Sequence, residues 1–180
     1  MKIPLLIMFI VFQHFFTLSL FAQCEEMLEN FSHEFWGEPV LTGAPILIPK
    51  IKFKITRRDT SEIVPLQTVR LRYVWEHFIV QYKTLTDGWR NSYDIIACTT
   101  NTDGEVLFPE YNLVPRGWYN GTKLGKRLPK FLELELSVEN YHFWITKNQI
   151  KTIRDKKNKK PIDLKRHDGY IPPIKVEIIP

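Results

Sequence analysis

The chain has 180 residues, of which 44% are hydrophobic, and it carries a formal net charge of +5. This length corresponds to one domain that can bury a sizeable core, so folding requires neither a metal ion nor a dense set of disulfides. The positive charge is compatible with loose attraction to anionic surfaces, but it is too small to indicate nucleic-acid binding.

The N-terminal segment has the features of a secretory signal peptide. Lys2 precedes an apolar run that ends at Ala22, the small residue expected before a cleavage site. We therefore predict a signal peptide over 1–22 and one exported domain, periplasmic or secreted, over 23–180, with no transmembrane segment after cleavage. Two alternatives stay open: an uncleaved leader that anchors the chain in the membrane, because the run is nearly long enough to span it, and a lipid on Cys24.

Cys24 and Cys98 are the two cysteines of the chain. In an exported protein they can form a disulfide. Closing so long a loop would contribute roughly 4 kcal/mol by restricting the unfolded chain. The alternative is that Cys98 is an unpaired, small apolar residue of the core.

Alternating apolar and polar residues, typical of half-buried strands, recur along the chain. The clearest segments are 51–56, 69–75, 131–138 and 174–178. No segment after the leader shows a helical period, and Asp-Gly pairs and prolines lie between the alternating runs. The pattern predicts an all-β fold, an antiparallel Ig-like or prealbumin-like sandwich of about seven strands.

The segment 98–111, CTTNTDGEVLFPEY, has the features of both a calcium loop and a hairpin. In a calcium loop Gly104 would form the sharp bend between oxygen ligands that include Asp103. However, Pro109 would interrupt the helix that follows such a loop. We therefore favour a hairpin, with a turn at Asp103 and Gly104, positive φ at Gly104, and a return strand through Val106.

This segment also resembles the hairpin of carboxypeptidase regulatory-like domains, which have a transthyretin-like (prealbumin-like) sandwich. The residues that fit the family pattern are Thr99, Thr100, Asp103, Gly104, Phe108 and Pro109. The resemblance extends over about Leu41 to Tyr141, although the Trp- and Arg-rich segment between Thr56 and Asp94 departs from it. It implies a seven-stranded sandwich with a non-catalytic accessory or binding role, and it transfers no catalytic residues.

His77 and His142, each close to aromatic residues, are the candidates for a catalytic or metal site. No nucleophile motif or metal-ligand spacing connects them. We therefore predict that the protein is not an enzyme and binds no cofactor or metal. A hydrolase or metal site assembled around the two histidines and a carboxylate is the alternative. Glu133 and Glu135 share one strand face, which we expect to be exposed to solvent.

Tryptophans are the candidates for partner contact. Trp89 and Trp118 lie in turn-like sequences, where an exposed indole can stack on a sugar or anchor a protein contact. The alternative is that they cover the end of the sandwich. Trp75 and Trp144 lie in apolar strand contexts and are expected in the core.

The segment 147–170 concentrates positive charge. Besides Lys151 and Arg154, it contains four closely spaced lysines: Lys156, Lys157, Lys159 and Lys160. These side chains can contact anionic lipid headgroups, a surface polysaccharide or an acidic partner, or they can form the solvated tip of a β-hairpin. Aromatic residues do not separate the four lysines, so we predict no nucleic-acid binding. Together these features predict an exported, non-catalytic β-sandwich module that binds a partner protein, a glycan or an anionic envelope surface.

Overall fold

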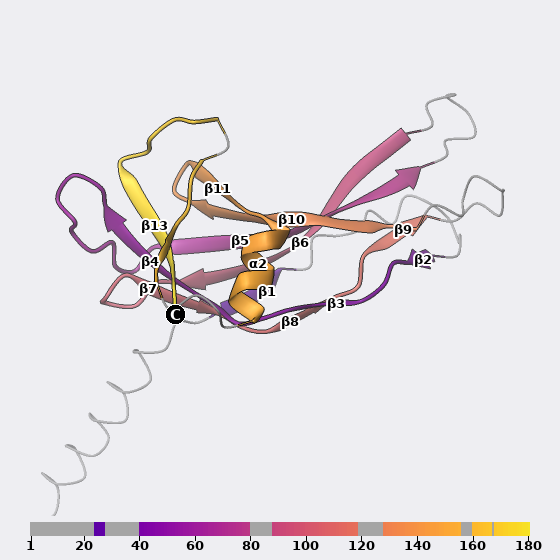
Figure 1. The fold of residues 1–180 in the computed structure, drawn as a ribbon, viewed down its shortest axis with the longest axis horizontal. Helices are drawn as coiled ribbons and strands as arrows, with labels where there is room; N and C mark the ends of the chain where they lie inside the picture. Colours follow the sequence, from indigo (N-terminus) through magenta and orange to yellow (C-terminus); the bar gives the residue numbers. More distant parts are fainter. Residues whose placement is uncertain (1–23, 28–39, 80–87, 119–127, 156–159, 167) are drawn as a thin grey trace, which may run out of the picture.

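The computed structural model describes residues 24–27, 40–79, 88–118, 128–155, 160–166 and 168–180. Within these ranges the chain forms thirteen strands and one short helix, so the predicted all-β class is confirmed (Figure 1). The elements are β1 (Cys24–Met27), β2 (Val40–Thr42), β3 (Ile46–Ile48), β4 (Ile51–Arg57), β5 (Thr68–Ile79), β6 (Gly88–Thr99), β7 (Glu105–Phe108), β8 (Tyr111–Leu113), β9 (Arg116–Trp118), β10 (Lys130–Val138), β11 (Tyr141–Ile145), α2 (Lys147–Arg154), β12 (Ile162–Asp163) and β13 (Ile174–Ile179).

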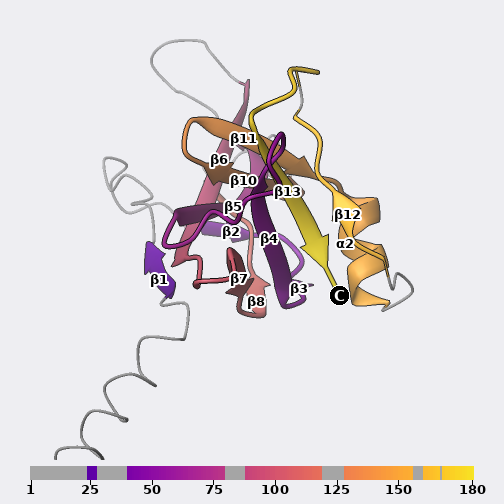
Figure 2. The same cartoon turned by 90° about the vertical axis from the view of Figure 1, so that its left-hand side faces the viewer.

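Two antiparallel sheets pack against each other and form the predicted sandwich (Figure 2). The larger sheet has the order β1-β6-β5-β10-β11, and the smaller has the order β12-β13-β4-β7. The four segments with the clearest alternation became β4, β5, β10 and β13. Alternation predicted them well because one face of each strand is buried between the sheets. The largest fully buried side chains include Phe53, Tyr73, Trp75, Phe108, Leu134 and Phe143.

The prediction of about seven strands is wrong, partly because prolines divide longer extended segments. The register of the β4–β7 ladder continues unchanged into the β3–β8 ladder. Pro49 and Pro109 lie in the break between these two ladders. Proline lacks the N–H group that a ladder requires, so the pairing of these two extended segments is interrupted and forms two separate ladders. The short β2–β9 ladder extends the same two segments further.

The predicted hairpin around Asp103 and Gly104 is also corrected. β6 pairs with β1 and β5 in the larger sheet, whereas β7 pairs with β4 in the smaller sheet. The segment between β6 and β7 is therefore a corner that carries the chain from one sheet to the other. Alternating hydrophobicity indicated both strands correctly, but it contains no information about which neighbour each strand pairs with.

Asn101 and Gly104 shape this corner. The side-chain oxygen of Asn101 accepts hydrogen bonds from the backbone N–H groups of Asp103 and Glu105, both at 2.9 Å. Gly104 has φ of +67°, as predicted, and a Cβ atom placed there would lie 2.6 Å from the backbone oxygen of Ile55. Asn101 thus uses its oxygen to hold the turn, and glycine is required by both backbone conformation and space.

Gly104→Val is expected to lower the free energy of unfolding. Positive φ in a β-branched residue costs roughly 1–3 kcal/mol, and the close approach to Ile55 adds to this cost. Asp103→Asn is the matched control, because Asp103 is exposed and Asn is equally compatible with a turn. Urea denaturation of both variants measures the difference. Equal stability of Gly104→Val and the wild type would show that the corner tolerates a side chain.

Helix α2 was not predicted from the sequence. The Thr146 side chain accepts a hydrogen bond from the backbone N–H of Gln149, and the Gln149 side chain accepts one from the backbone N–H of Thr146. This capping box starts the helix. Only Ile150 is buried and Ile153 is half-buried, so eight residues contain too few apolar positions to reveal a helical period. The first part of the basic segment is therefore a helix and not a β-hairpin tip.

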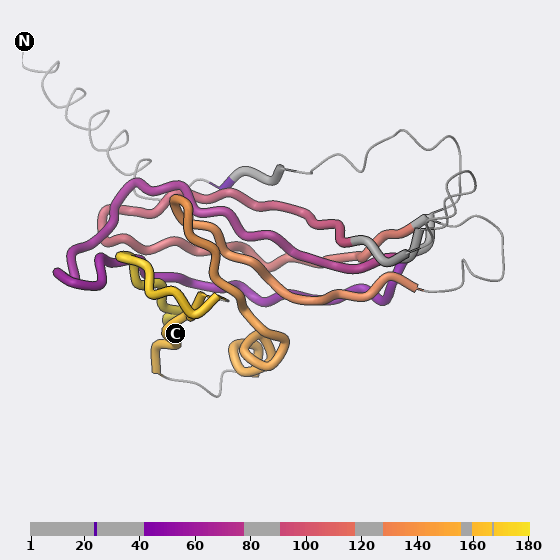
Figure 3. The backbone as a smooth tube through the Cα atoms, turned by 90° about the horizontal axis from the view of Figure 1, so that it is seen from above, coloured from indigo at the N-terminus to yellow at the C-terminus, as the bar shows by residue number. Residues whose placement is uncertain are grey.

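The helix lies beside the sandwich, on the same side as the C-terminal strands, as Figures 2 and 3 both show. No helix in the described ranges is long and apolar enough to cross a bilayer. The position of α2 matters for function, because it stands next to β3 and the start of β10 and closes one side of a groove with them.

Candidate functional site

The two candidate histidines lie on opposite faces of the larger sheet. His77 is buried on the inner face of β5, with 3% of its surface exposed. His142 lies on the outer face of β11, because it pairs with Ser137, while the neighbouring Phe143 and Leu136 point into the core. The side chain of His142 is 44% exposed. The histidines therefore do not meet in one cleft, which corrects the alternative site predicted around them.

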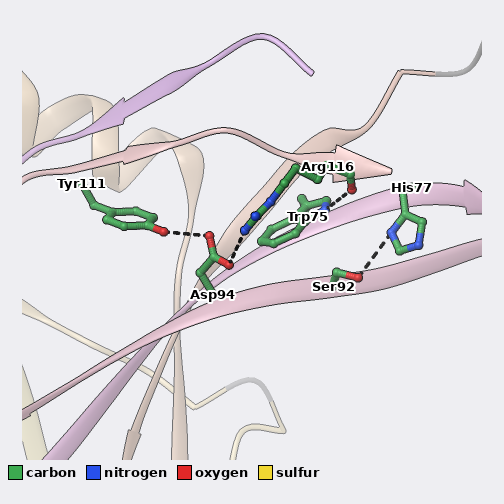
Figure 4. Close-up of polar contacts among 6 residues, drawn as sticks. All are labelled: Trp75, His77, Ser92, Asp94, Tyr111 and Arg116. Carbon is green, nitrogen blue, oxygen red and sulfur yellow. Dashed lines mark hydrogen bonds and ion pairs between the residues drawn. The ribbon is translucent and has the colours of Figure 1, made fainter. Parts of the chain in front are cut away.

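A buried carboxylate connects strands of the sandwich that are distant in sequence (Figure 4). Asp94, on the inner face of β6, is 4% exposed. The Tyr111 hydroxyl donates a hydrogen bond of 2.7 Å to its Oδ2 atom, and Arg116 Nη2 lies 3.2 Å from its Oδ1 atom. Because Tyr111 belongs to β8 and Arg116 to β9, this carboxylate fastens both short strands to the larger sheet.

The same polar row contains a serine and a histidine, which with Asp94 form the residue set of a hydrolase triad. Ser92 Oγ lies 3.4 Å from His77 Nδ1, and Asp94 directs its two oxygens to Tyr111 and Arg116 (Figure 4). In a catalytic triad the carboxylate instead orients the histidine. We therefore interpret the row as structural. The Trp75 indole N–H donates a hydrogen bond of 2.7 Å to the Arg116 carbonyl oxygen, and this bond also links β9 to the larger sheet.

A second polar cluster lies on the outer face of the larger sheet. The Oε1 atom of Glu135 contacts Nδ1 of His142, and the Oε2 atom of Glu135 lies 3.5 Å from Nη1 of Arg72. Ser137 Oγ is 3.2 Å from the same nitrogen of His142. Serine and carboxylate share one ring nitrogen, so the histidine is not placed between them as a proton relay. Glu135 is only 8% exposed, which corrects its predicted exposure to solvent.

The predicted partner-contact residues fall mostly outside what the structure describes. The backbones of Trp89 and Trp118 lie in β6 and β9 and not in turns, and their side chains lie outside the described part. Lys156, Lys157 and Lys159 also lie outside the described residues, whereas Lys160 is described and exposed.

The structure also places the two tryptophans that were expected in the core. Trp75 is in the core, as predicted, but Trp144 is half-buried on the outer face, opposite Glu135.

The two cysteines are joined by a disulfide. Cys24 and Cys98 are directly opposite each other in the β1–β6 ladder, and the bridge links them across 74 positions of sequence. It fastens β1 to the edge of the larger sheet. The disulfide and the alternative of a lipid on Cys24 exclude each other, because both use the same sulfur atom.

An apolar groove of about 450 Å³ lies between α2, β3 and the start of β10. Its lining includes Ala44, Ile46, Leu47, Ile48, Pro129, Phe131 and Ile150. A β-bulge between Phe131 and Glu133 turns Phe131 inward, opposite Trp75, where strict alternation would have turned Leu132. Three segments that are distant in sequence therefore supply one apolar floor.

The other described residues that line the groove are cations: Lys130, Lys147, Lys151 and Arg154. The last three are spaced at i, i+4 and i+7 on α2, so they follow one face of the helix on either side of the buried Ile150. Lys147 Nζ lies 5.8 Å from the centre of the Phe131 ring. The basic segment indicated Lys151 and Arg154 in advance, but its sequence gave no sign of the apolar floor or of Lys130.

No family model, curated protein or solved structure matches the chain. A functional assignment therefore depends on the geometry of the groove and of the two polar clusters. Of these, the groove combines an accessible apolar surface with one sign of charge, which is the combination expected of a binding site.

Proposed function

We propose that the protein is an exported, non-catalytic β-sandwich module that binds an anionic surface of the cell envelope. The observation that carries this proposal is the groove beside α2, where every ionisable lining residue that the structure describes is positive. Four cations around one concave surface raise the local concentration of an anionic partner. The apolar floor then adds binding energy when it is removed from water.

The leader sequence and the resemblance to carboxypeptidase regulatory-like domains support the same proposal. A cleaved signal peptide over 1–22 would bring the domain to the envelope, and the family resemblance implies an accessory binding role. Both polar clusters are compatible with a non-catalytic protein, because Asp94 and Glu135 are each held by neighbouring side chains in arrangements that connect strands.

We expect the purified protein to sediment with vesicles that contain phosphatidylglycerol and not with vesicles of phosphatidylcholine alone. Each basic side chain near an anionic membrane contributes about 1 kcal/mol. Lys147→Gln/Lys151→Gln should therefore weaken vesicle binding by about 30-fold, since 1.4 kcal/mol corresponds to a factor of ten.

The matched control is Lys54→Gln/Arg70→Gln, which removes the same charge from the outer faces of the two sheets. It should weaken binding much less than the groove variant. An equal loss in the two double variants would show that net charge alone attracts the protein. If the wild type does not bind phosphatidylglycerol vesicles, the proposed function is wrong.

A further inference from the structure

We infer that the groove beside α2 binds a single acyl chain, with the anionic headgroup of that ligand held at the cationic rim. The inference depends on the proposed function and gives its site a ligand class: an amphiphile with one alkyl chain and a carboxylate or phosphate head. The evidence is the chemistry of the lining, the size of the groove and the position of the charges relative to the apolar floor.

The lining selects for the chemistry of the headgroup. Among the described residues, its polar side chains are lysine and arginine, which donate hydrogen bonds and accept none. A ligand whose polar atoms only accept, such as a carboxylate or phosphate, can satisfy all of them. A sugar would present hydroxyl donors as well, and the described residues of the lining include no Asp, Glu, Asn, Gln, Ser or Thr side chain to accept from them.

The floor selects for an alkyl chain. It is formed by aliphatic side chains from β3 and α2, such as Ile46 and Ile150, together with the Phe131 ring. The volume of the groove, about 450 Å³, falls within the range of roughly 300–1,000 Å³ that is usual for small-molecule sites. Figure 1 shows α2 between β10 and β3, with its axis across the direction of these strands. A flexible alkyl chain can follow this surface.

The cations and the floor are contiguous, so one ligand can engage both. Lys147 Nζ is 5.8 Å from the centre of the Phe131 ring, which means that an ammonium group stands directly beside the apolar surface. The alkyl stems of lysine extend the apolar area while their charged ends reach solvent. An amphiphile with its chain on Phe131 and Ile150 would therefore place its head among Lys147, Lys151 and Arg154.

Laurate, used below its micelle concentration, tests the inference by isothermal titration calorimetry on the purified protein. We expect laurate to bind, and acetate and dodecyltrimethylammonium not to bind. Ala44→Phe fills the groove from an exposed position outside the strands, so it should weaken laurate binding at least about tenfold without loss of folding. Lys147→Gln/Lys151→Gln should have a similar effect, and Lys54→Gln/Arg70→Gln should have little.

Each other outcome overturns the inference in a recognisable way. Equal binding of dodecyltrimethylammonium would show that the rim does not select the headgroup, and laurate binding unaffected by Ala44→Phe would place the chain outside the groove. Binding of an acidic Glu-Leu repeat peptide in place of laurate would assign the groove to a protein partner. Vesicle binding without laurate binding would leave the proposed function standing and reject only the acyl-chain site, whereas failure of both would reject the two together.

Discussion

Asp94→Ala is expected to lower the free energy of unfolding by about 3 kcal/mol. The carboxylate accepts from the Tyr111 hydroxyl and pairs with Arg116, and hydrogen bonds to a charged group contribute roughly 1.5–3 kcal/mol each. The Arg116 side chain is 42% exposed and can regain water, which keeps the loss below the full cost of breaking a buried ion pair. Urea denaturation at neutral pH measures the change.

Tyr111→Phe provides the matched comparison, because it removes only the hydroxyl and leaves the contact between Asp94 and Arg116. Its expected cost is about 1 kcal/mol. If the two side chains act through one hydrogen bond, the double variant should be more stable than the sum of the single effects predicts, by an interaction energy of roughly 0.5 kcal/mol or more. Additive effects, or an Asp94→Ala variant as stable as the wild type, would contradict the fastening role.

Asp94 also illustrates what the sequence did not reveal. Alternation identified β4 and β5 because it reports whether one face of a strand is buried. It does not report which segments lie opposite each other, and the partners of Asp94 are supplied by two short strands, β8 and β9, 17 and 22 residues away. A carboxylate in a strand is read as exposed until its partners are known, and the same reason explains the wrong expectation for Glu135.

The corner at Gly104 separates local from long-range information. The positive φ of Gly104 was predictable because it is a property of the turn itself, and the Asp-Gly sequence indicates it. The pairing of β7 with β4 was not predictable from the turn, because a hairpin and a corner between sheets accept the same residues. The resemblance to carboxypeptidase regulatory-like domains, which was based on this segment as a hairpin, stays a proposal.

The groove was only half predictable. Positive charge near Lys151 and Arg154 is a feature of composition and needs no knowledge of the fold. The floor requires Ile46, Phe131 and Ile150 to come together from three elements, and Phe131 points inward only because a bulge interrupts β10. Neither the bulge nor the eight-residue helix leaves a periodic pattern long enough to detect, so the binding site emerges only from the packed structure.

Removal of the disulfide is expected to destabilise the protein by about 4 kcal/mol. The bridge between Cys24 and Cys98 spans 74 positions, and closing a loop of that length restricts the unfolded chain by this amount in the chain-entropy account. The suitable variant is Cys24→Ser/Cys98→Ala, because Cys24 is exposed whereas Cys98 is 1% exposed and would leave a buried hydroxyl as serine. Urea denaturation with and without dithiothreitol compares this variant with the wild type.

Dithiothreitol should lower the stability of the wild type to near that of the double variant and should leave the variant unchanged. Before reduction, iodoacetamide should label no thiol in the purified protein, and after reduction it should label two. A lipid on Cys24 would instead leave Cys98 as one unpaired thiol, which is buried in β6 and would react only after denaturation. One labelled site in the denatured, unreduced chain would therefore reject the disulfide and favour the lipid alternative. In the described residues the β1–β6 ladder has four residue pairs, and the bridge adds a covalent link to this short ladder.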